Sequence, residues 1–256
     1  MSASETLILP QMVDMWQLTL GWQPMDEQQG LFQQFYEGIL EGNRRLNLTR
    51  ITEPIDFWEK HLWDSLRGVW NQESGILGAT PASPVQDLEA NSEIQAQSLK
   101  LIDIGTGAGF PGIPIAIAFP HHSVTLLDST RKKITYLNAL IAQLGIQNVT
   151  TLIGRAEALT HQLQHRQTYD IALLRAVAPA SVCAEYALPL LQTGGLAILY
   201  RGNWTDEETE SLKPILEKLG GVIESIEGFT TPISKSVRHC IYLRACAPLK
   251  ELPLKK

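Results

Sequence analysis

A glycine-rich loop between two apolar segments is the part of this chain best suited to hold a nucleotide-type cofactor. The run LIDIGTGAGFPGIPIAI, residues 101–117, predicts a strand that ends in an acid, a loop and then a helix. Gly105, Gly107, Gly109 and Gly112 let the backbone turn sharply and approach a ligand, next to the free N–H groups of the following helix. The spacing also satisfies the pattern GxGxxG, so it fits both NAD and S-adenosylmethionine.

Further candidate ligand contacts follow the next predicted strands. In a doubly wound sheet the ligand lies across the carboxyl ends of the strands. Asp128 follows the second strand, where a carboxylate accepts ribose hydroxyls; capping the next helix is its alternative role. Ala156 and Glu157 follow the third strand, where a small residue and an acid would flank an adenine ring. Arg175 follows the fourth, with either an anionic or planar ligand or a buried acid as its partner.

The elements that position these residues alternate along residues 99–256. The strands LKLIDI, VTLLD, VTTLI, YDIALL and GLAILY are separated by helices predicted at 112–119, 130–144, 158–164 and 179–191. This alternation predicts an α/β domain with a doubly wound, mostly parallel sheet. Thr205 and Glu208 form a capping-box signature for a further helix that Gly220 and Gly221 end. Two consecutive strands then follow, so we expect the sheet to finish with an antiparallel strand.

The pattern of residues 1–70 predicts an N-terminal helical extension. Apolar residues at helical spacing predict one helix over 26–45 and a second that Thr52 caps and Pro54 begins. His61 and Asp64 lie on one face of the second helix, either to shape a substrate site or as a structural pair. Residues 71–98 are rich in Gly, Ser, Pro, Ala and Gln and read as a flexible linker or insertion before the domain at 99–256.

Composition limits the classes of function. The N-terminus lacks a signal peptide, and no apolar run is long enough to span a bilayer, so we expect a cytoplasmic protein. Three cysteines are too few and wrongly spaced for a zinc site, and no metal is expected. The net charge is −6, but residues 99–256 carry 16 Lys/Arg against 13 Asp/Glu. A local basic patch can therefore still bind the phosphate backbone of a nucleic acid, despite the negative net charge.

At this point the chain resembles the RsmG/GidB family of small-subunit ribosomal RNA guanine-N7 methyltransferases. The resemblance rests on NLTRI at 47–51, HLWDSL at 61–66, the glycine loop, VTLLDSTRKKITYL at 124–137, GRAEAL and YDIALLRAVAPA at 169–180. It implies a Rossmann-like class I methyltransferase fold and methyl transfer from S-adenosylmethionine to N7 of a guanine in 16S ribosomal RNA. The implied partner is that RNA or the assembling small subunit. The implied cofactor contacts are Gly105, Phe110, Asp128, Ser129, Thr130, Ala156, Glu157 and Arg175.

The chain departs from the family pattern in two places. Residues 71–98 look like an insertion relative to shorter members, and Arg201-Gly202 stands where relatives often have Lys-Gly. The candidate RNA contacts are the cations that could line one basic track, with ordinary solvated helix faces as the alternative. They are Arg44, Arg45, Arg50, Lys60, Arg131, Lys132, Lys133 and Arg201.

Missing motifs favour the same reaction. The fourth strand is followed by Arg175-Ala176-Val177 rather than the Asn/Asp-Pro-Pro-aromatic turn usual for adenine amines, and Cys183 falls inside a predicted helix, poorly placed as a thiolate nucleophile. Guanine N7 has an in-plane lone pair, so direct displacement needs alignment and no general base, with Arg175 in an orienting role. The target guanine must lie in a loop or junction, since the A-form major groove is too narrow to enter.

Two other classes of function remain as alternatives. An NAD-dependent oxidoreductase would show a similar glycine loop and ribose acid, although the chain has no Tyr-x-x-x-Lys segment. A non-catalytic RNA-binding factor in ribosome assembly would explain the basic residues equally well. Titration with S-adenosylmethionine and with NADH distinguishes a methyltransferase from these alternatives.

Overall fold

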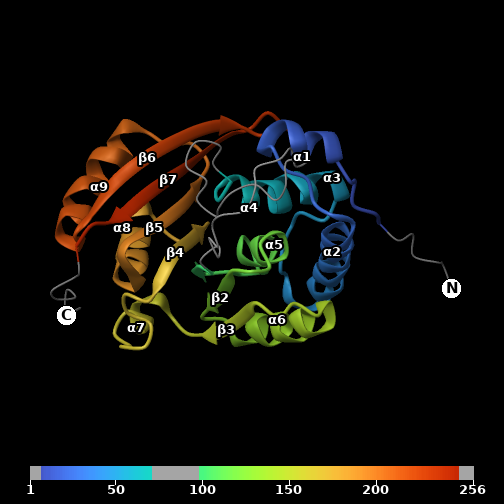
Figure 1. The fold of residues 1–256 in the computed structure, drawn as a ribbon, viewed down its shortest axis with the longest axis horizontal. Coiled ribbons are helices and arrows are strands. Elements are labelled where there is room, and N and C mark those ends of the chain that lie inside the picture. The colour runs from blue at the N-terminus through green and yellow to red at the C-terminus, as the bar shows by residue number, and fades with distance from the viewer. Residues whose placement is uncertain (1–6, 71–97, 248–256) are drawn as a thin grey trace, which may run out of the picture.

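A seven-stranded sheet forms the middle layer of the computed structural model, which describes residues 7–70 and 98–247 (Figure 1). The strand order is β3-β2-β1-β4-β5-β7-β6. The first five strands in this order are parallel to one another, and β7 is antiparallel to both β5 and β6. The strands are β1 (Lys100–Ile104), β2 (Ser123–Asp128), β3 (Val149–Ile153), β4 (Tyr169–Arg175), β5 (Leu191–Arg201), β6 (Gly221–Thr230) and β7 (Val237–Ala245).

The central strands are apolar on both faces, because helices cover both faces of the sheet. Successive side chains of a strand point to opposite sides, so Leu101 joins one buried cluster and Ile102 the other. The first cluster contains α5 (Gly112–Ala118) and α6 (Arg131–Leu144). The second contains α7 (Ala156–Leu159), α8 (Ala180–Ala187), the 3₁₀ turn η2 (Leu188–Leu190) and α9 (Asp206–Leu219). The parallel strand ends thus point to one edge between two helical layers.

The N-terminal helices pack into the first cluster, on the same side of the sheet as α5 (Figure 1). They are α1 (Val13–Leu20), α2 (Asp26–Leu46), α3 (Pro54–Phe57), the π-helix η1 (Trp58–Trp63) and α4 (Asp64–Arg67). Two buried tyrosines tie α4 to the sheet: Tyr200 donates to the Ser65 carbonyl at 2.8 Å, and Tyr242 to the Gly68 carbonyl at 3.0 Å. Helix α4 therefore has a fixed position over β5 and β7.

Most predicted elements are confirmed, including the mostly parallel sheet, the antiparallel finish and the Thr205–Glu208 capping box. The cap predicted at Thr52 is wrong: Glu53 occupies the N-cap without a side-chain bond, although Pro54 does begin the helix. The helix predicted at 158–164 is the single turn Ala156–Leu159, and the helix predicted to reach residue 191 ends at Ala187. Pro189 lies two residues beyond that end, in the 3₁₀ turn η2, where its ring and missing N–H disfavour a further α-helical turn. Except for residue 98, the predicted linker 71–98 lies outside the described residues.

Two glycines of α2 give a matched test of how this helix packs. A Cβ atom at Gly42 would meet the ring of Tyr136 on α6, and that ring is held by a hydrogen bond from its hydroxyl to the Gly38 carbonyl. At Gly30 of the same helix a Cβ atom would meet nothing within 4 Å. We expect Gly42→Ala to lower the free energy of unfolding by about 1–3 kcal/mol through overpacking. Gly30→Ala should raise it by up to about 1 kcal/mol through helix propensity.

Urea unfolding followed by circular dichroism measures both changes. Equal effects at the two glycines would contradict the close approach of α2 and α6.

Candidate active site

The carboxyl end of β2 places Asp128 against the glycine loop that follows β1. Its Oδ2 accepts the Gly107 N–H at 3.0 Å, and its Oδ1 accepts the Thr130 N–H at 2.7 Å. The Asp128 side chain is therefore fixed, and both roles weighed for it, helix start and ligand acid, are geometrically compatible. Each carboxylate oxygen has a second lone pair, which can accept a further hydrogen bond.

The glycine loop takes backbone conformations that residues with a side chain rarely adopt. Gly107 has a φ of +59°, and a Cβ atom there would meet only the Gly105 carbonyl at 3.9 Å, so the loop faces open space. Gly105 has a φ of +72°, and a Cβ atom there would lie 2.9 Å from a methyl of Val177. The glycine loop and the segment after β4 are therefore in close contact. This cradle fits a nucleoside-type cofactor, because backbone approaches the open space without side chains in the way.

Asp103 at the end of β1 fixes the two ends of the glycine loop. Its Oδ2 accepts the Thr106 hydroxyl at 2.6 Å and the Gly112 N–H at 2.8 Å. Its Oδ1 is buried and has no hydrogen-bond partner among the described residues. Burial raises the pKa of Asp103 to about 6, against the opposing effect of these two donors. Its role in the structure is thus to hold the loop, from inside the protein.

The other acidic and small residues predicted for the site lie beside Asp128. Ala156 is buried and Glu157 half-buried at the start of α7, after β3, which pairs with β2. The Glu157 carboxylate accepts a hydrogen bond from the Tyr186 hydroxyl at 2.9 Å. Ser129 and Thr130 are exposed just after Asp128. The structure therefore brings the predicted contacts from β2 and β3 to one edge of the sheet.

Arg175 at the end of β4 turns its guanidinium toward the N-terminal helices. It donates to the Lys60 carbonyl at 2.8 Å, to Asp64 Oδ2 at 3.1 Å and to His61 Nδ1 at 3.2 Å. The structure thus contains the buried acid that the sequence offered as one of the two partners for Arg175. The His61 and Asp64 side chains, which the sequence placed on one helix face, both contact this guanidinium.

The ring of Phe110 packs into the N-terminal helices. It stacks on the His61 ring with centroids 4.1 Å apart and an interplanar angle of 9°, and the Arg175 guanidinium carbon lies 5.3 Å from its centroid. Phe35 and Phe57 lie beside it. Only 5% of Phe110 is exposed, so this residue can offer a cofactor its backbone but little of its ring. No sequence pattern signalled this contact between residues 49 positions apart.

The protonation state of His61 follows from its two partners. Burial, together with the charge on Arg175, lowers the pKa of His61 to about 3. Arg175 can only donate, so His61 Nδ1 accepts, and the ring proton is on Nε2, which faces the Thr49 hydroxyl at 2.7 Å. Thr49 is held in turn, because its N–H donates to Asn43 Oδ1 at 3.0 Å and its carbonyl accepts from Asn43 Nδ2 at 2.8 Å.

The candidate RNA contacts divide into two sets. Gly38 faces Leu140 and Gly42 faces Tyr136, so α2 and α6 run antiparallel. The antiparallel packing brings the cations at the end of α2 beside those at the start of α6. This set comprises Arg44, Arg45, Arg131, Lys132 and Lys133, with Arg44 and Arg45 also paired to Glu41.

The remaining candidate cations are more dispersed. Lys60 pairs with Asp56. Arg201 donates to the Ala178 carbonyl at 2.9 Å and pairs with Glu208, which makes it a support for the loop after β4. Arg50 is exposed in the turn after α2.

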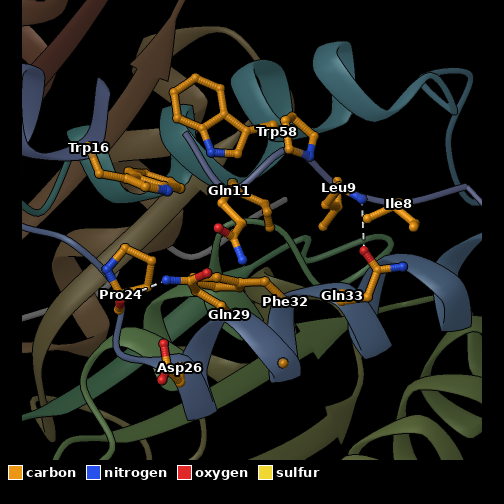
Figure 2. A pocket seen from close by; sticks show the side chains of 13 residues that line it. Ile8, Leu9, Gln11, Trp16, Pro24, Asp26, Gln29, Phe32, Gln33 and Trp58 are labelled. Atoms are coloured by element: carbon orange, nitrogen blue, oxygen red, sulfur yellow. Dashed lines mark hydrogen bonds between the residues drawn. The ribbon is translucent and has the colours of Figure 1, made fainter. Parts of the chain in front are cut away.

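A separate pocket of about 340 Å³ lies on the N-terminal helices (Figure 2). Trp16, Phe32 and Trp58 converge on it from α1, α2 and η1. Trp58 and Leu62 of η1 line this pocket, whereas His61 and Asp64 contact Arg175. The pocket and the glycine loop thus lie on different sides of η1, and we place the chemistry at the loop, where the fixed carboxylates are.

Residues 7–70 and 98–247 contain no cluster of three or more His, Cys, Asp or Glu side chains placed to hold a metal ion. Within the same ranges, every helix is too short or too polar to cross a membrane.

A mostly parallel sheet with an antiparallel β7, a glycine loop after β1 and an acid after β2 form a Rossmann-like fold of the class I methyltransferase type. A model of the GidB family, described as rRNA small subunit methyltransferase G, matches residues 28–76 and 84–247. The chain belongs to this family.

Curated relatives with the same name as the family model align with nearly the whole chain. Ribosomal RNA small subunit methyltransferase G of Nostoc punctiforme is 57% identical over 94% of this chain and 92% of the relative. The protein of the same name from Microcystis aeruginosa is 52% identical over 93% of this chain and 99% of the relative.

The low pKa of His61 predicts a pH dependence of stability. An unfolded histidine titrates near pH 6.5, so the folded protein binds this proton less tightly than the unfolded chain. The contribution of neutral His61 to the free energy of unfolding is complete above pH 6.5. It is lost as the pH falls from there toward 3, because the unfolded chain then binds the proton and the folded protein does not. Between pH 7 and 5 we expect the wild type to lose about 2 kcal/mol more unfolding free energy than His61→Gln.

Urea unfolding at the two pH values measures the losses. Equal losses in the two proteins would mean that His61 is not buried in its neutral form.

Proposed function

We propose that this chain transfers the methyl group of S-adenosylmethionine to N7 of a guanine in 16S ribosomal RNA. Membership of the family supports the substrate class. The observation that carries the cofactor site is the Asp128 carboxylate, which is held against the Gly107 N–H with lone pairs free for a ribose. The same geometry alone would also suit NAD, and the family decides between the two cofactors.

The residues that would hold the cofactor come from three strand ends. Asp128 accepts the ribose hydroxyls, Ala156 and Glu157 flank the adenine, and the backbone of the Gly105–Phe110 loop lies against the amino-acid end. Ser129 and Thr130 border the ribose from the start of α6. The bound sulfonium supplies an electrophilic methyl group.

The side chains around the site favour a nucleophile that needs no deprotonation. Neutral His61 already uses both ring nitrogens in hydrogen bonds, so it is a poor general base. Burial raises the pKa of Cys183, and its Sγ donates to the Ala178 carbonyl, which disfavours a thiolate. Guanine N7 meets this condition, because its in-plane lone pair can attack the methyl directly. Arg175 then orients the reactants and accepts no proton.

The basic residues beside the cofactor site would bind the RNA backbone. Lys132 lies at the start of α6, four residues after Asp128 in the chain, and Arg45 lies at the end of the antiparallel α2. This set adjoins the proposed site, so an RNA held there would present an unpaired guanine to the methyl group. We place the reaction in the cytoplasm, on small-subunit RNA or an assembling subunit.

The cofactor site and the reaction are tested together. The purified chain, supplied with S-adenosylmethionine labelled in its methyl group and with small-subunit RNA, should form N7-methylguanine. Asp128→Ala should weaken cofactor binding by roughly 1–3 kcal/mol in calorimetry, because charge-assisted ribose hydrogen bonds are lost. Asp170→Ala is the matched control: Asp170 also accepts a backbone N–H, that of Lys100 at 2.7 Å, at the amino end of the strands.

Unchanged affinity in a folded Asp128→Ala protein would remove this residue from the site. Label found at a position other than N7 would overturn the proposed reaction.

The RNA surface is tested by removing one cation from each helix. Each neutralised phosphate releases counterions, so log affinity falls with log salt concentration. Lys132→Ala combined with Arg45→Ala should weaken RNA binding, flatten its salt dependence and leave S-adenosylmethionine affinity intact. Lys213→Ala with Lys218→Ala removes the same charge from α9, on the other face of the sheet, and should change neither slope nor cofactor affinity.

Filter binding across a salt series measures both slopes. If the Arg45 and Lys132 variant matches the parent protein, these residues do not hold RNA.

A further inference from the structure

We propose that His61 is a positioning residue for methyl transfer, which holds Arg175 and Phe110 in one fixed relation. This inference rests on the proposed function and adds to it a role for a histidine that accepts no proton. Arg175 is the last residue of β4 and Phe110 lies in the loop after β1, so the two belong to separate segments at the same edge of the sheet. His61, on η1, contacts both.

The contacts of His61 involve its ring face and both of its nitrogens. One face stacks on Phe110, with the centroids 4.1 Å apart. Nδ1 accepts from Arg175 at 3.2 Å, and Nε2 donates to the Thr49 hydroxyl at 2.7 Å. A ring with three such contacts cannot rotate about χ2 without losing at least two of them. The imidazole is therefore held in one orientation.

Thr49 provides the fixed point of this arrangement. Besides its two backbone bonds with Asn43, its hydroxyl also accepts the Ile51 N–H at 3.0 Å. The turn that contains Thr49 also carries the exposed Arg50. A chain of direct contacts thus runs from a surface turn, through His61, to the loop that would hold the cofactor.

The two segments that His61 joins also touch each other. Ala176, next to Arg175, has a φ of +56°, a strained conformation for a residue with a side chain. Val177 leaves no room for a Cβ atom at Gly105. A shift of Arg175 would therefore move the segment that packs on the glycine loop. Since misplacement by about 1 Å can cost about a hundredfold in rate, small shifts here matter.

The stack and the hydrogen bonds of His61 can be removed separately. His61→Phe keeps a flat ring on Phe110 but loses both nitrogen contacts, and Thr49→Val removes only the hydroxyl. We expect both variants to lower kcat for RNA methylation by roughly tenfold or more, while the Kd for S-adenosylmethionine changes by less than about threefold. Thr49→Ser, which restores the hydroxyl, should recover kcat. His61→Gln keeps an acceptor and a donor but loses the stack, and should weaken cofactor binding by about fivefold or more.

The matched control is His165→Phe. His165 is also a histidine whose pKa is lowered by burial, and its Nδ1 lies 2.9 Å from the Tyr169 hydroxyl, at the amino end of β4. This variant should leave kcat and cofactor Kd unchanged. All variants are compared at equal folded fractions by circular dichroism.

Wild-type kcat in folded His61→Phe and Thr49→Val proteins would overturn the positioning role. A failure of Thr49→Ser to recover activity would do the same, since the hydroxyl would then not be the cause. If the wild type bound S-adenosylmethionine but did not methylate RNA, the proposed function would fail. The His61→Gln affinity measurement would then still decide whether His61 supports the cofactor loop.

Discussion

The buried charge of Arg175 is the constraint on which the arrangement of this protein depends. Its side chain is only 16% exposed and that of Asp64 13%, so each charge is largely removed from water. A charge in that position is strongly unfavourable unless a partner of opposite sign and further hydrogen bonds accompany it. The sheet supplies the cation, and the N-terminal helices supply the carboxylate, a carbonyl and an imidazole. The sheet domain and the N-terminal helices therefore each provide part of one buried ion pair and its hydrogen bonds.

The same dependence extends along the interface. Gln28 of α2 donates to the carbonyls of Ile117 and Ala118, which are acceptors at the end of α5 that have no partner within their own helix. Glu59 of η1 accepts the N–H groups of Ile233 and Ser234, between β6 and β7. The N-terminal helices thus provide hydrogen-bond partners for backbone groups of the sheet domain.

The sequence predicted the sheet domain better than the contacts of the N-terminal helices. Strands and helices of 99–247 have strong periodicity and clear stop signals, such as the capping box of α9 and the glycine that ends it. Helix α1 was missed, because it is eight residues long and its first residues have no side-chain cap. The π-helical turn at Trp58–Trp63 could not be predicted, since its widened geometry depends on tertiary packing rather than on local propensity.

The candidate site shows the same division. Asp128 and the glycines could be found because strand ends in a parallel sheet share one edge. The partners of Arg175 could only be named as possible types. Thr49 was not considered, because a hydrogen bond between a turn residue and a residue twelve positions further on leaves no periodic trace. The stack of Phe110 on His61 depends on how two separately predicted layers dock, which a single sequence does not specify.

The π-helix η1 restricts how the length of this chain can change during evolution. Trp58 and Leu62 of η1 line the pocket on the N-terminal helices, whereas His61 of η1 and Asp64, the first residue of α4, contact Arg175. Inserting or deleting one residue would turn the side chains beyond it to a different face of the helix. One set of side chains would then leave its partners. We therefore expect insertions and deletions in related chains to collect outside residues 58–67.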